Sequence, residues 1–152
     1  MLLDFITNEF ILIPVCAWII AQVSKMFVAL FQGKGLDFGY LVSSGGMPSS
    51  HSAIVTALAT TIGMLNGFGT TEFAISVILA LIVLYDSAGV RQAASQQAVV
   101  LNHIVREIKL KQPMTTLEAD LRELIGHTPF QVIIGAAIGI VFPLIWITIA
   151  TL

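Results

Sequence analysis

The sequence predicts an all-α integral membrane protein, a helical bundle of four main spans that forms a single domain over residues 1–152. Of its 152 residues, 57% are hydrophobic and only 11% are charged, against about 25% charged in an ordinary soluble domain. The mean hydropathy is +0.93. Such a chain has too few polar side chains to cover a globule in water, which nearly excludes a soluble enzyme and also excludes a disordered chain.

Four apolar stretches account for this composition. The first runs from Phe10 to about Phe31 and the last from Pro129 to Leu152, and both reach the roughly 20 residues that a helix needs to cross the hydrocarbon. Two shorter runs lie between them, from about His51 to Leu65 and from Phe73 to Tyr85, the latter continuing more weakly toward Val90. Short runs favour helices whose ends open into a water-filled cavity of the protein.

The segments between these runs differ in character. Residues 32–50 are rich in glycine and serine and predict a loop, whereas residues 66–71 have the length of a tight helical hairpin. Residues 91–126 are amphipathic, with apolar side chains at helical spacing until Pro113 and a second short helix expected before Gly126. We expect these amphipathic helices to lie at the cytoplasmic membrane surface.

The basic residues fall on one side of the expected membrane. Alternating spans place all seven of them on or near the face where the second and fourth runs begin: Lys25, Lys34, Arg91, Arg106, Lys109, Lys111 and Arg122. Because cytoplasmic loops carry the excess of lysine and arginine, this face is predicted to be cytoplasmic, with both termini outside. We expect a bacterial inner (cytoplasmic) membrane, with any pocket at this face open to the cytoplasm.

Net charge and cysteine content exclude further classes of site. A formal net charge of −2 offers no basic surface to nucleic acid. The single cysteine excludes a disulfide framework and a multi-cysteine zinc site. We also expect no metal and no cofactor. Membrane lipids are the expected partners, and the sequence leaves homo-oligomerisation open.

The first chemical motif, Gly45–Ser52, opens the second apolar run. Glycines let a backbone approach a ligand closely, and a serine before an apolar run caps a helix. The free N–H groups and positive dipole end of a helix start suit an anion such as phosphate. His51 stands beside this start and can give or take a proton. A plain capped helix start with an interfacial histidine is the alternative interpretation.

The second motif, Tyr85–Arg91, ends the third run. Asp86 and Arg91 are ionisable side chains near the end of an expected span, and such residues at membrane depth are costly enough to be functional candidates. The alternative is an ion pair that only anchors the helix end, although a spacing of five residues makes the two imperfect partners.

The third motif, Gly126–Pro129, opens the last run. Thr128 is a natural N-cap and Pro129 a natural first helical residue, so His127 is expected at a second helix start on the same face as the first. Lys25, near the end of the first run, adds a cation to this face. The alternative interpretation is that its side chain only snorkels toward the lipid headgroups. Two histidines at two helix starts with cations nearby indicate phosphate chemistry.

In combination, the blocks GGMPSSHSA (45–53), YDSAGVRQAASQQAVVLN (85–102) and GHTPFQV (126–132) closely resemble a known family. It comprises small, divergent bacterial and plant membrane proteins related to type 2 phosphatidic acid phosphatases and vanadium haloperoxidases. The resemblance extends from about Gln22 to Gly139. In the broader superfamily, a P-S-G-H block supplies an acid histidine and phosphate-binding backbone. An S-R-x5-H-x3-D block supplies an arginine, a nucleophilic histidine and a carboxylate that orients it.

The resemblance implies roles for residues of the first and third motifs. Pro48, Ser49, Ser50 and His51 match the first block, with Ser50 in place of its glycine, and His51 would be the acid. His127 matches the nucleophile. Gln131 occupies the position of the orienting carboxylate.

The serine-arginine pair and the K-x6-R-P block of the superfamily have no counterpart in the chain. The candidate replacements lie on other helices: Arg91 and Lys25 for the cations and Asp86 for the carboxylate.

The predicted function is that of a metal-independent, acid-phosphatase-like hydrolase. It would hydrolyse a lipid phosphate, or a similar small phosphomonoester or pyrophosphate, through a phosphohistidine on His127, with His51 and Asp86 as the other catalytic residues. The predicted substrate-binding residues are Lys25, Ser49, Ser50, Arg91 and Gln131. Vanadate is expected only as a phosphate mimic, and the sequence gives no specific cue for haloperoxidase chemistry. The alternative, which Gln131 favours, is a non-catalytic membrane protein that binds phosphate or a lipid headgroup and has lost turnover.

Overall fold

A computed structural model describes residues 6–31, 33, 46–111 and 127–152, without the side chains of residues 91, 95 and 106–111. The described chain is α-helical and contains no strand, which confirms the predicted all-α class. Its helices are α2 (Glu9–Phe31), α3 (Ser50–Leu65), α4 (Thr71–Ala88), α5 (Val90–Lys111) and α6 (Pro129–Ala150). The predicted loop at 32–50 and the short helix before Gly126 fall largely or wholly outside the described residues.

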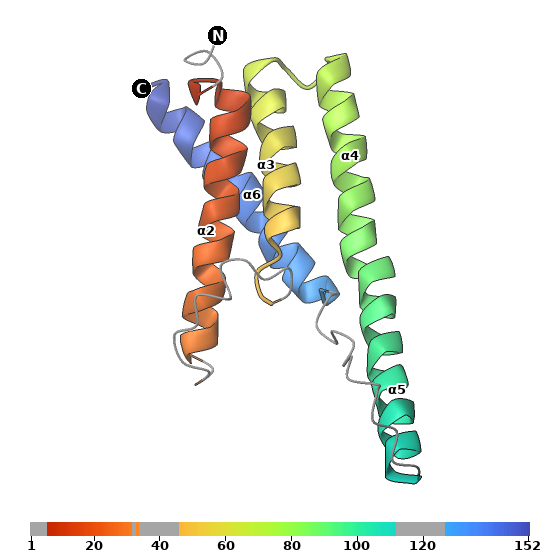
Figure 1. The fold of residues 1–152 in the computed structure, drawn as a ribbon. Coiled ribbons are helices and arrows are strands. Elements are labelled where there is room, and N and C mark those ends of the chain that lie inside the picture. Colours follow the sequence, from red (N-terminus) through yellow and green to blue (C-terminus); the bar gives the residue numbers. More distant parts are fainter. Residues whose placement is uncertain (1–5, 32, 34–45, 112–126) are drawn as a thin grey trace.

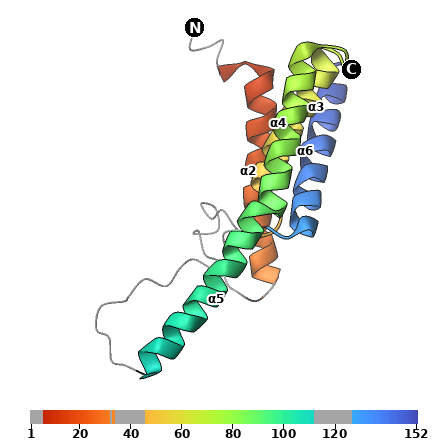
Figure 2. The ribbon, with the colours of Figure 1, turned by 90° about the vertical axis from the view of Figure 1, so that its right-hand side faces the viewer.

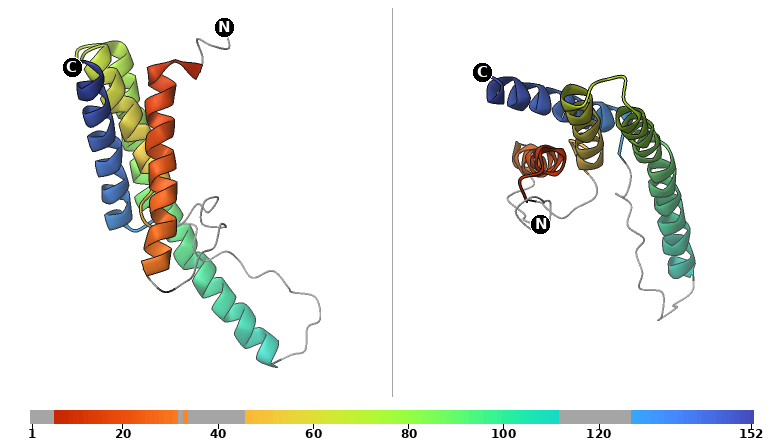
Figure 3. Two further views of the ribbon diagram at one scale, coloured as in Figure 1. Left: turned by 90° about the vertical axis from the view of Figure 1, so that its left-hand side faces the viewer. Right: turned by 90° about the horizontal axis from the view of Figure 1, so that it is seen from above.

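The short helix α3 lies at the centre of the bundle and packs against α2, α4 and α6 (Figures 1 and 3). Among the described residues, α2, the continuous stretch from Thr71 to Val105, and α6 are long and apolar enough to cross a membrane, whereas α3 is shorter. The outer helices expose large apolar side chains such as Ile75 and Ile133. The chain is therefore a helical membrane bundle in which the shortest helix is enclosed by longer ones.

Two helix starts are built as the sequence predicts. Ser49 is the N-cap of α3, and its Oγ accepts a hydrogen bond from the Ser52 amide at 3.3 Å. Thr128 is the N-cap of α6 and Pro129 its first residue. Gln131 completes a capping box there. Its side chain accepts from the Thr128 amide, and Thr128 Oγ1 accepts from the Gln131 amide.

Helix α5 follows α4 after Gly89 alone. The Gly89 amide still donates to the Tyr85 carbonyl, and the Ala93 amide donates to the Gly89 carbonyl, so helical hydrogen bonding continues across the junction. As a result α5 extends beyond the end of the bundle where α3 and α6 begin, as Figure 2 shows. The expected amphipathic helix after the third span is confirmed, and its contact with the membrane surface stays a prediction.

Small residues on α6 allow α3 and α6 to pack closely. A Cβ at Gly135 would overlap the Ser49 carbonyl, and one at Gly139 would overlap the Thr56 hydroxyl and the Ala53 carbonyl. Thr56 Oγ1 also lies 3.3 Å from the Ala136 carbonyl oxygen across this contact. Glycines four residues apart are a recurrent means of bringing membrane helices together. We call this contact the α3–α6 seam.

Gly139→Val is expected to destabilise the protein by about 1–3 kcal/mol, because added methyl groups must push the two backbones apart. The check is thermal unfolding in detergent. Ala137→Val is the matched control, since Ala137 is exposed on the same helix. Equal shifts for the two variants would contradict the close packing of the seam.

Candidate functional site

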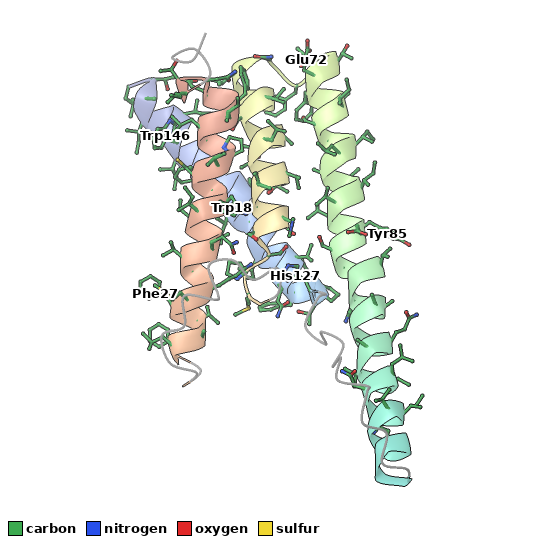
Figure 4. All side chains as sticks on the ribbon, viewed as in Figure 1. Trp18, Phe27, Glu72, Tyr85, His127 and Trp146 are labelled. Atoms are coloured by element: carbon green, nitrogen blue, oxygen red, sulfur yellow. The ribbon has the colours of Figure 1, made fainter. Side chains whose placement is uncertain are left out.

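Polar side chains are buried together at the end of the bundle where α3 and α6 begin and α4 ends. They come from four helices or helix starts: Lys25 from α2, Ser49, Ser50 and Ser52 from α3, Ser87 from α4, and His127 just before α6. All of them are less than 3% exposed. Figure 4 labels His127 at this end of the bundle. Burying such groups in a membrane protein costs free energy. A buried polar cluster of this kind is therefore typical of a functional site.

Lys25 brings a cation to the start of α3. Its Nζ lies 3.2 Å from Ser50 Oγ, and the side chain is 2% exposed. The chain enters α3 through Gly46, at φ +91°, and a cis Met47–Pro48 peptide. A Cβ at Gly46 would be 4.0 Å from Lys25 Cδ, so the loop passes beside the lysine stem. The positive φ favours glycine at this position.

His127 is held by contacts with α4 and α6. Its amide donates to the Ser87 carbonyl at 3.4 Å, and its Nδ1 lies 3.4 Å from Gln131 Oε1. Gln131 Oε1 also accepts from the Thr128 amide at 3.1 Å, so it acts as an acceptor in both contacts. An acceptor beside Nδ1 favours the tautomer with the proton on Nδ1, which leaves the lone pair on Nε2.

The two helix starts are joined directly. The Ser49 amide donates to the Gln131 carbonyl at 3.0 Å, which fixes the N-cap of α3 against the first turn of α6. The rings of His51 and His127 lie with their centroids 6.4 Å apart and their planes at 56°. This separation allows both rings to contact one tetrahedral anion, since each hydrogen-bond contact needs about 3 Å.

Two buried atoms at this site have no hydrogen-bond partner among the described residues, His127 Nε2 and Ser87 Oγ. A third, Gln22 Oε1, belongs to α2 three residues before Lys25. Buried polar atoms are nearly always paired in folded proteins, so unpaired ones indicate where a ligand or water binds. Gln22 and Ser87 were not predicted as site residues, although each is a polar residue within one helical turn of a candidate in an apolar run.

Burial lowers the pKa of the His127 imidazole below its ordinary value of 6.5. The hydrogen bond with Gln131 opposes this change, while the charges of Lys25 and His51 act in the same direction as burial. Contact with the Gly46 backbone also favours the protonated ring. The net result is a ring that stays neutral near neutral pH, as a nucleophile requires.

The midpoint of His127 protonation is expected to lie below pH 6.5, and Gln131→Leu is expected to lower this pKa further by removing a contact that favours the cation. Titration of the ¹⁵N-labelled imidazole by NMR checks both statements. A wild-type midpoint above 6.5, or an upward shift in Gln131→Leu, would contradict this account of the ring's environment.

The structure brings together six of the eight predicted site residues: Lys25, Ser49, Ser50, His51, His127 and Gln131. Asp86 is half-buried and lines an outward groove with exposed Tyr85 and Val90, and Figure 4 shows Tyr85 pointing away from the bundle. Arg91 lies in the first turn of α5, with its side chain outside the described part. Within the described ranges, no group of three or more His, Cys, Asp or Glu side chains could hold a metal ion.

Comparison with known proteins gives two similarities. A family model described as the divergent PAP2 family matches residues 6–142. The chain is 36% identical over 152 residues to the uncharacterized membrane protein YuiD of Bacillus subtilis (strain 168), an alignment that covers 94% of this chain and 96% of the relative. No solved structure matches the chain.

Proposed function

Because the chain belongs to the divergent PAP2 family, we propose that it is a membrane-embedded phosphatase acting on a lipid phosphate or a similar phosphate ester. The observation that carries the proposal is the pairing of His127, whose buried Nε2 has no partner among the described residues, with the His51 ring 6.4 Å away. Nucleophile and acid would thus stand on either side of one phosphoryl group.

The first step would transfer the phosphoryl group to the protein. His127 Nε2 attacks phosphorus, a P–N bond forms, and the bond to the leaving oxygen breaks while His51 donates a proton to that oxygen. In the second step His51 takes a proton from water, the resulting hydroxide attacks phosphorus, and the P–N bond breaks to release phosphate. Gln131 would hold the Nδ1 proton of His127 through both steps.

The negative oxygens would be held by one cation and two helix starts. Lys25 Nζ, already 3.2 Å from Ser50 Oγ, supplies a cationic hydrogen-bond donor. The starts of α3 and α6 add the positive ends of their helix dipoles. Ser87 Oγ, buried and without a partner in the described part, is a further donor. Arg91 stays the second candidate cation. The proposal needs no metal or cofactor, and vanadate would bind as a phosphate mimic.

A non-catalytic role in binding phosphate or a lipid headgroup is the second candidate function. One observation favours it: the position next to His127 that needs a carboxylate is held by Gln131, which already accepts from the Thr128 amide as part of a helix cap. An uncharged partner stabilises the imidazolium that forms during attack on phosphorus less than a carboxylate does. Such a protein would bind the anion without turning it over.

Phosphate release by the purified protein from dodecyl phosphate, phenyl phosphate and a phosphatidic acid in detergent tests the proposal. We expect release that depends on His127 and is inhibited by vanadate. Vanadate binding without release from any of these substrates would establish the binding function instead. Absence of both would overturn the two candidates together.

We further propose that the site faces the cytoplasm of a bacterial inner membrane. Helix α5 extends from the site end of the bundle and carries Lys109 and Lys111 in its last turn. The opposite end, where α3 turns into α4, has Glu72 and no lysine or arginine in residues 62–74. Lysine and arginine near span ends favour the cytoplasmic side.

The orientation predicts which cysteines react from outside the cell. In a Cys16→Ser background, Asn66→Cys is expected to react with a membrane-impermeant maleimide, and Val99→Cys on α5 to react only after the membrane is opened. Both positions are exposed, so accessibility within the protein is matched. The reverse labelling pattern would show that the site faces outward.

A further inference from the structure

Helices α4 and α5 together are far longer than a membrane is thick. They contain 18 and 22 residues and are separated by Gly89 alone. At 1.5 Å per helical residue the whole stretch measures about 60 Å, twice the roughly 30 Å of a hydrocarbon core. Tyr85, 78% exposed in the last turn of α4, is an aromatic residue of the kind that lies at the membrane–water interface. In the orientation that Figure 2 shows, α5 therefore projects beyond the membrane into water.

An exposed apolar stripe runs along α5. Its members are Val90, Ala94, Leu101 and Ile104, which recur at helical spacing and lie on one face of the helix. All four side chains are exposed. Among the described helices, α4 alone contacts α5. We call these residues the α5 stripe, and an apolar face of this kind in water indicates a surface that binds a partner.

The α5 stripe continues a surface of α4 that faces lipid. Its first residue, Val90, lines an outward groove together with Ile82 and Tyr85. Ile82 and Tyr85 are exposed on a helix that is apolar enough to span the membrane, so their side of α4 contacts lipid. A bend at Gly89 toward this side would keep the stripe in contact with lipid, and α5 would not have to turn about its own axis.

The junction at Gly89 permits such a bend. Two backbone hydrogen bonds hold it, from the Gly89 amide to the Tyr85 carbonyl at 2.8 Å and from the Ala93 amide to the Gly89 carbonyl at 2.9 Å. Glycine favours the continuation of a helix less than any residue except proline. The 15 residues of segment 112–126, which join α5 to His127, can reach up to about 50 Å. This reach exceeds the roughly 33 Å length of α5, so chain connectivity allows the bend.

Charge decides between the two surfaces that could cover the stripe, a second copy of the chain and the membrane. The sequence of α5 has four basic residues and one acidic residue: Arg91, Arg106, Lys109, Lys111 and Glu107. A second copy in the same membrane would bring the same positive charges alongside, which opposes association. Anionic lipid headgroups attract them instead. The charge of α5 therefore complements a membrane surface.

We infer that the α5 stripe binds the anionic surface of the leaflet at the site end of the bundle, with the chain bent at Gly89 to place it there. Sequence periodicity predicts only that a surface helix follows the third span. The structure adds the face that contacts lipid, the residue at which the chain bends and the side toward which it bends. This inference does not depend on the proposed phosphatase activity.

Depth-dependent fluorescence quenching tests the contact in the full-length protein. In a Cys16→Ser background, an environment-sensitive fluorophore is attached to Leu101→Cys or to Val99→Cys, positions 49% and 48% exposed and on opposite faces of α5. Each protein is placed, one copy per nanodisc, in phosphatidylcholine with one third phosphatidylglycerol and a lipid carrying a doxyl quencher near its headgroup. We expect quenching at Leu101 at least about fivefold stronger than at Val99. Equal quenching at both positions, or protection of Leu101 only in nanodiscs with two copies, would overturn the inference.

Two further variants test the charge and the bend. Lys109→Gln with Lys111→Gln is expected to lower the ratio of docked to undocked α5 at least about tenfold in anionic nanodiscs, and to change nothing in pure phosphatidylcholine. Gly89→Ala is expected to weaken quenching at Leu101, because alanine stiffens the helix and its Cβ would lie 3.0 Å from the Tyr85 carbonyl oxygen. Gly69→Ala, in open space at the other end of α4, is the matched control. Quenching that is insensitive to the lysines would refute the role of charge, and quenching unchanged in Gly89→Ala would refute the bend. None of these measurements requires phosphate release, so they hold whether or not the protein is a phosphatase.

Discussion

His127→Ala is expected to lower phosphate release by at least about 10³-fold, the largest loss of any single substitution in the chain. The substitution removes the atom that would bond to phosphorus, and the other residues of the site can then only orient the substrate. His127 is buried and is held by its contacts to Ser87 and Gln131. No other histidine among the described residues occupies this position. Rapid quenching with ³²P-labelled substrate should trap an acid-labile phosphoprotein in the wild type alone.

His103→Ala is the matched control, because His103 is an exposed histidine on α5. Its rate should equal that of the wild type. His127→Ala should still bind vanadate, more weakly, through Lys25 and the helix starts. If His127→Ala retained a tenth or more of the wild-type rate, His127 would not be the nucleophile.

Gln131→Glu is expected to raise turnover by about 10²-fold, the largest gain. In a serine protease, replacing the carboxylate next to the catalytic histidine by its amide costs about 10⁴ in rate. The reverse change here should return part of that factor, since Gln131 Oε1 is 3.4 Å from His127 Nδ1. Glutamate is also the usual third residue of a capping box, so the start of α6 keeps its hydrogen bonds. A carboxylate raises the pKa of its histidine partner, so the wild type and the variant should be compared over full pH–rate profiles.

Two variants separate charge from capping. Gln131→Met has similar length and no acceptor, and is expected to lower turnover and weaken the start of α6. Gln131→Asp brings the charge with a shorter side chain and should give a smaller gain than glutamate. Unchanged turnover in both acidic variants, together with its loss in Asp86→Asn, would identify Asp86 as the orienting carboxylate.

The helices and their caps could be predicted because their causes are local. Apolar runs, Thr128 before Pro129, and Ser49 before a long apolar stretch each determine a helix start without reference to distant residues. The meeting of His51 and His127 was predictable from topology, since alternating spans bring both helix starts to one face.

The partners within the site could not be predicted, because they depend on how the helices rotate against one another. Sequence spacing favoured Asp86 as the charged group of α4, whereas in the structure the neighbouring Ser87 is buried and its backbone carbonyl accepts from the His127 amide. The burial of Gln22 likewise depends on how α2 packs in the bundle. Gln131 has two functions, one in the helix cap and one as the partner of the His127 ring. Both likewise depend on the three-dimensional packing.

The close packing of α3 and α6 at the seam also determines the geometry of the site. The Ser49 amide is bonded to the Gln131 carbonyl, and Gly135 and Gly139 fix how closely the two helices approach behind that bond. The spacing of the two histidine rings is therefore set by glycines that contact no substrate. A misplacement of about 1 Å can cost a hundredfold in rate. A protein with both histidines intact could thus be inactive because of one methyl group, and its surviving affinity for phosphate would reveal that only the alignment had been lost.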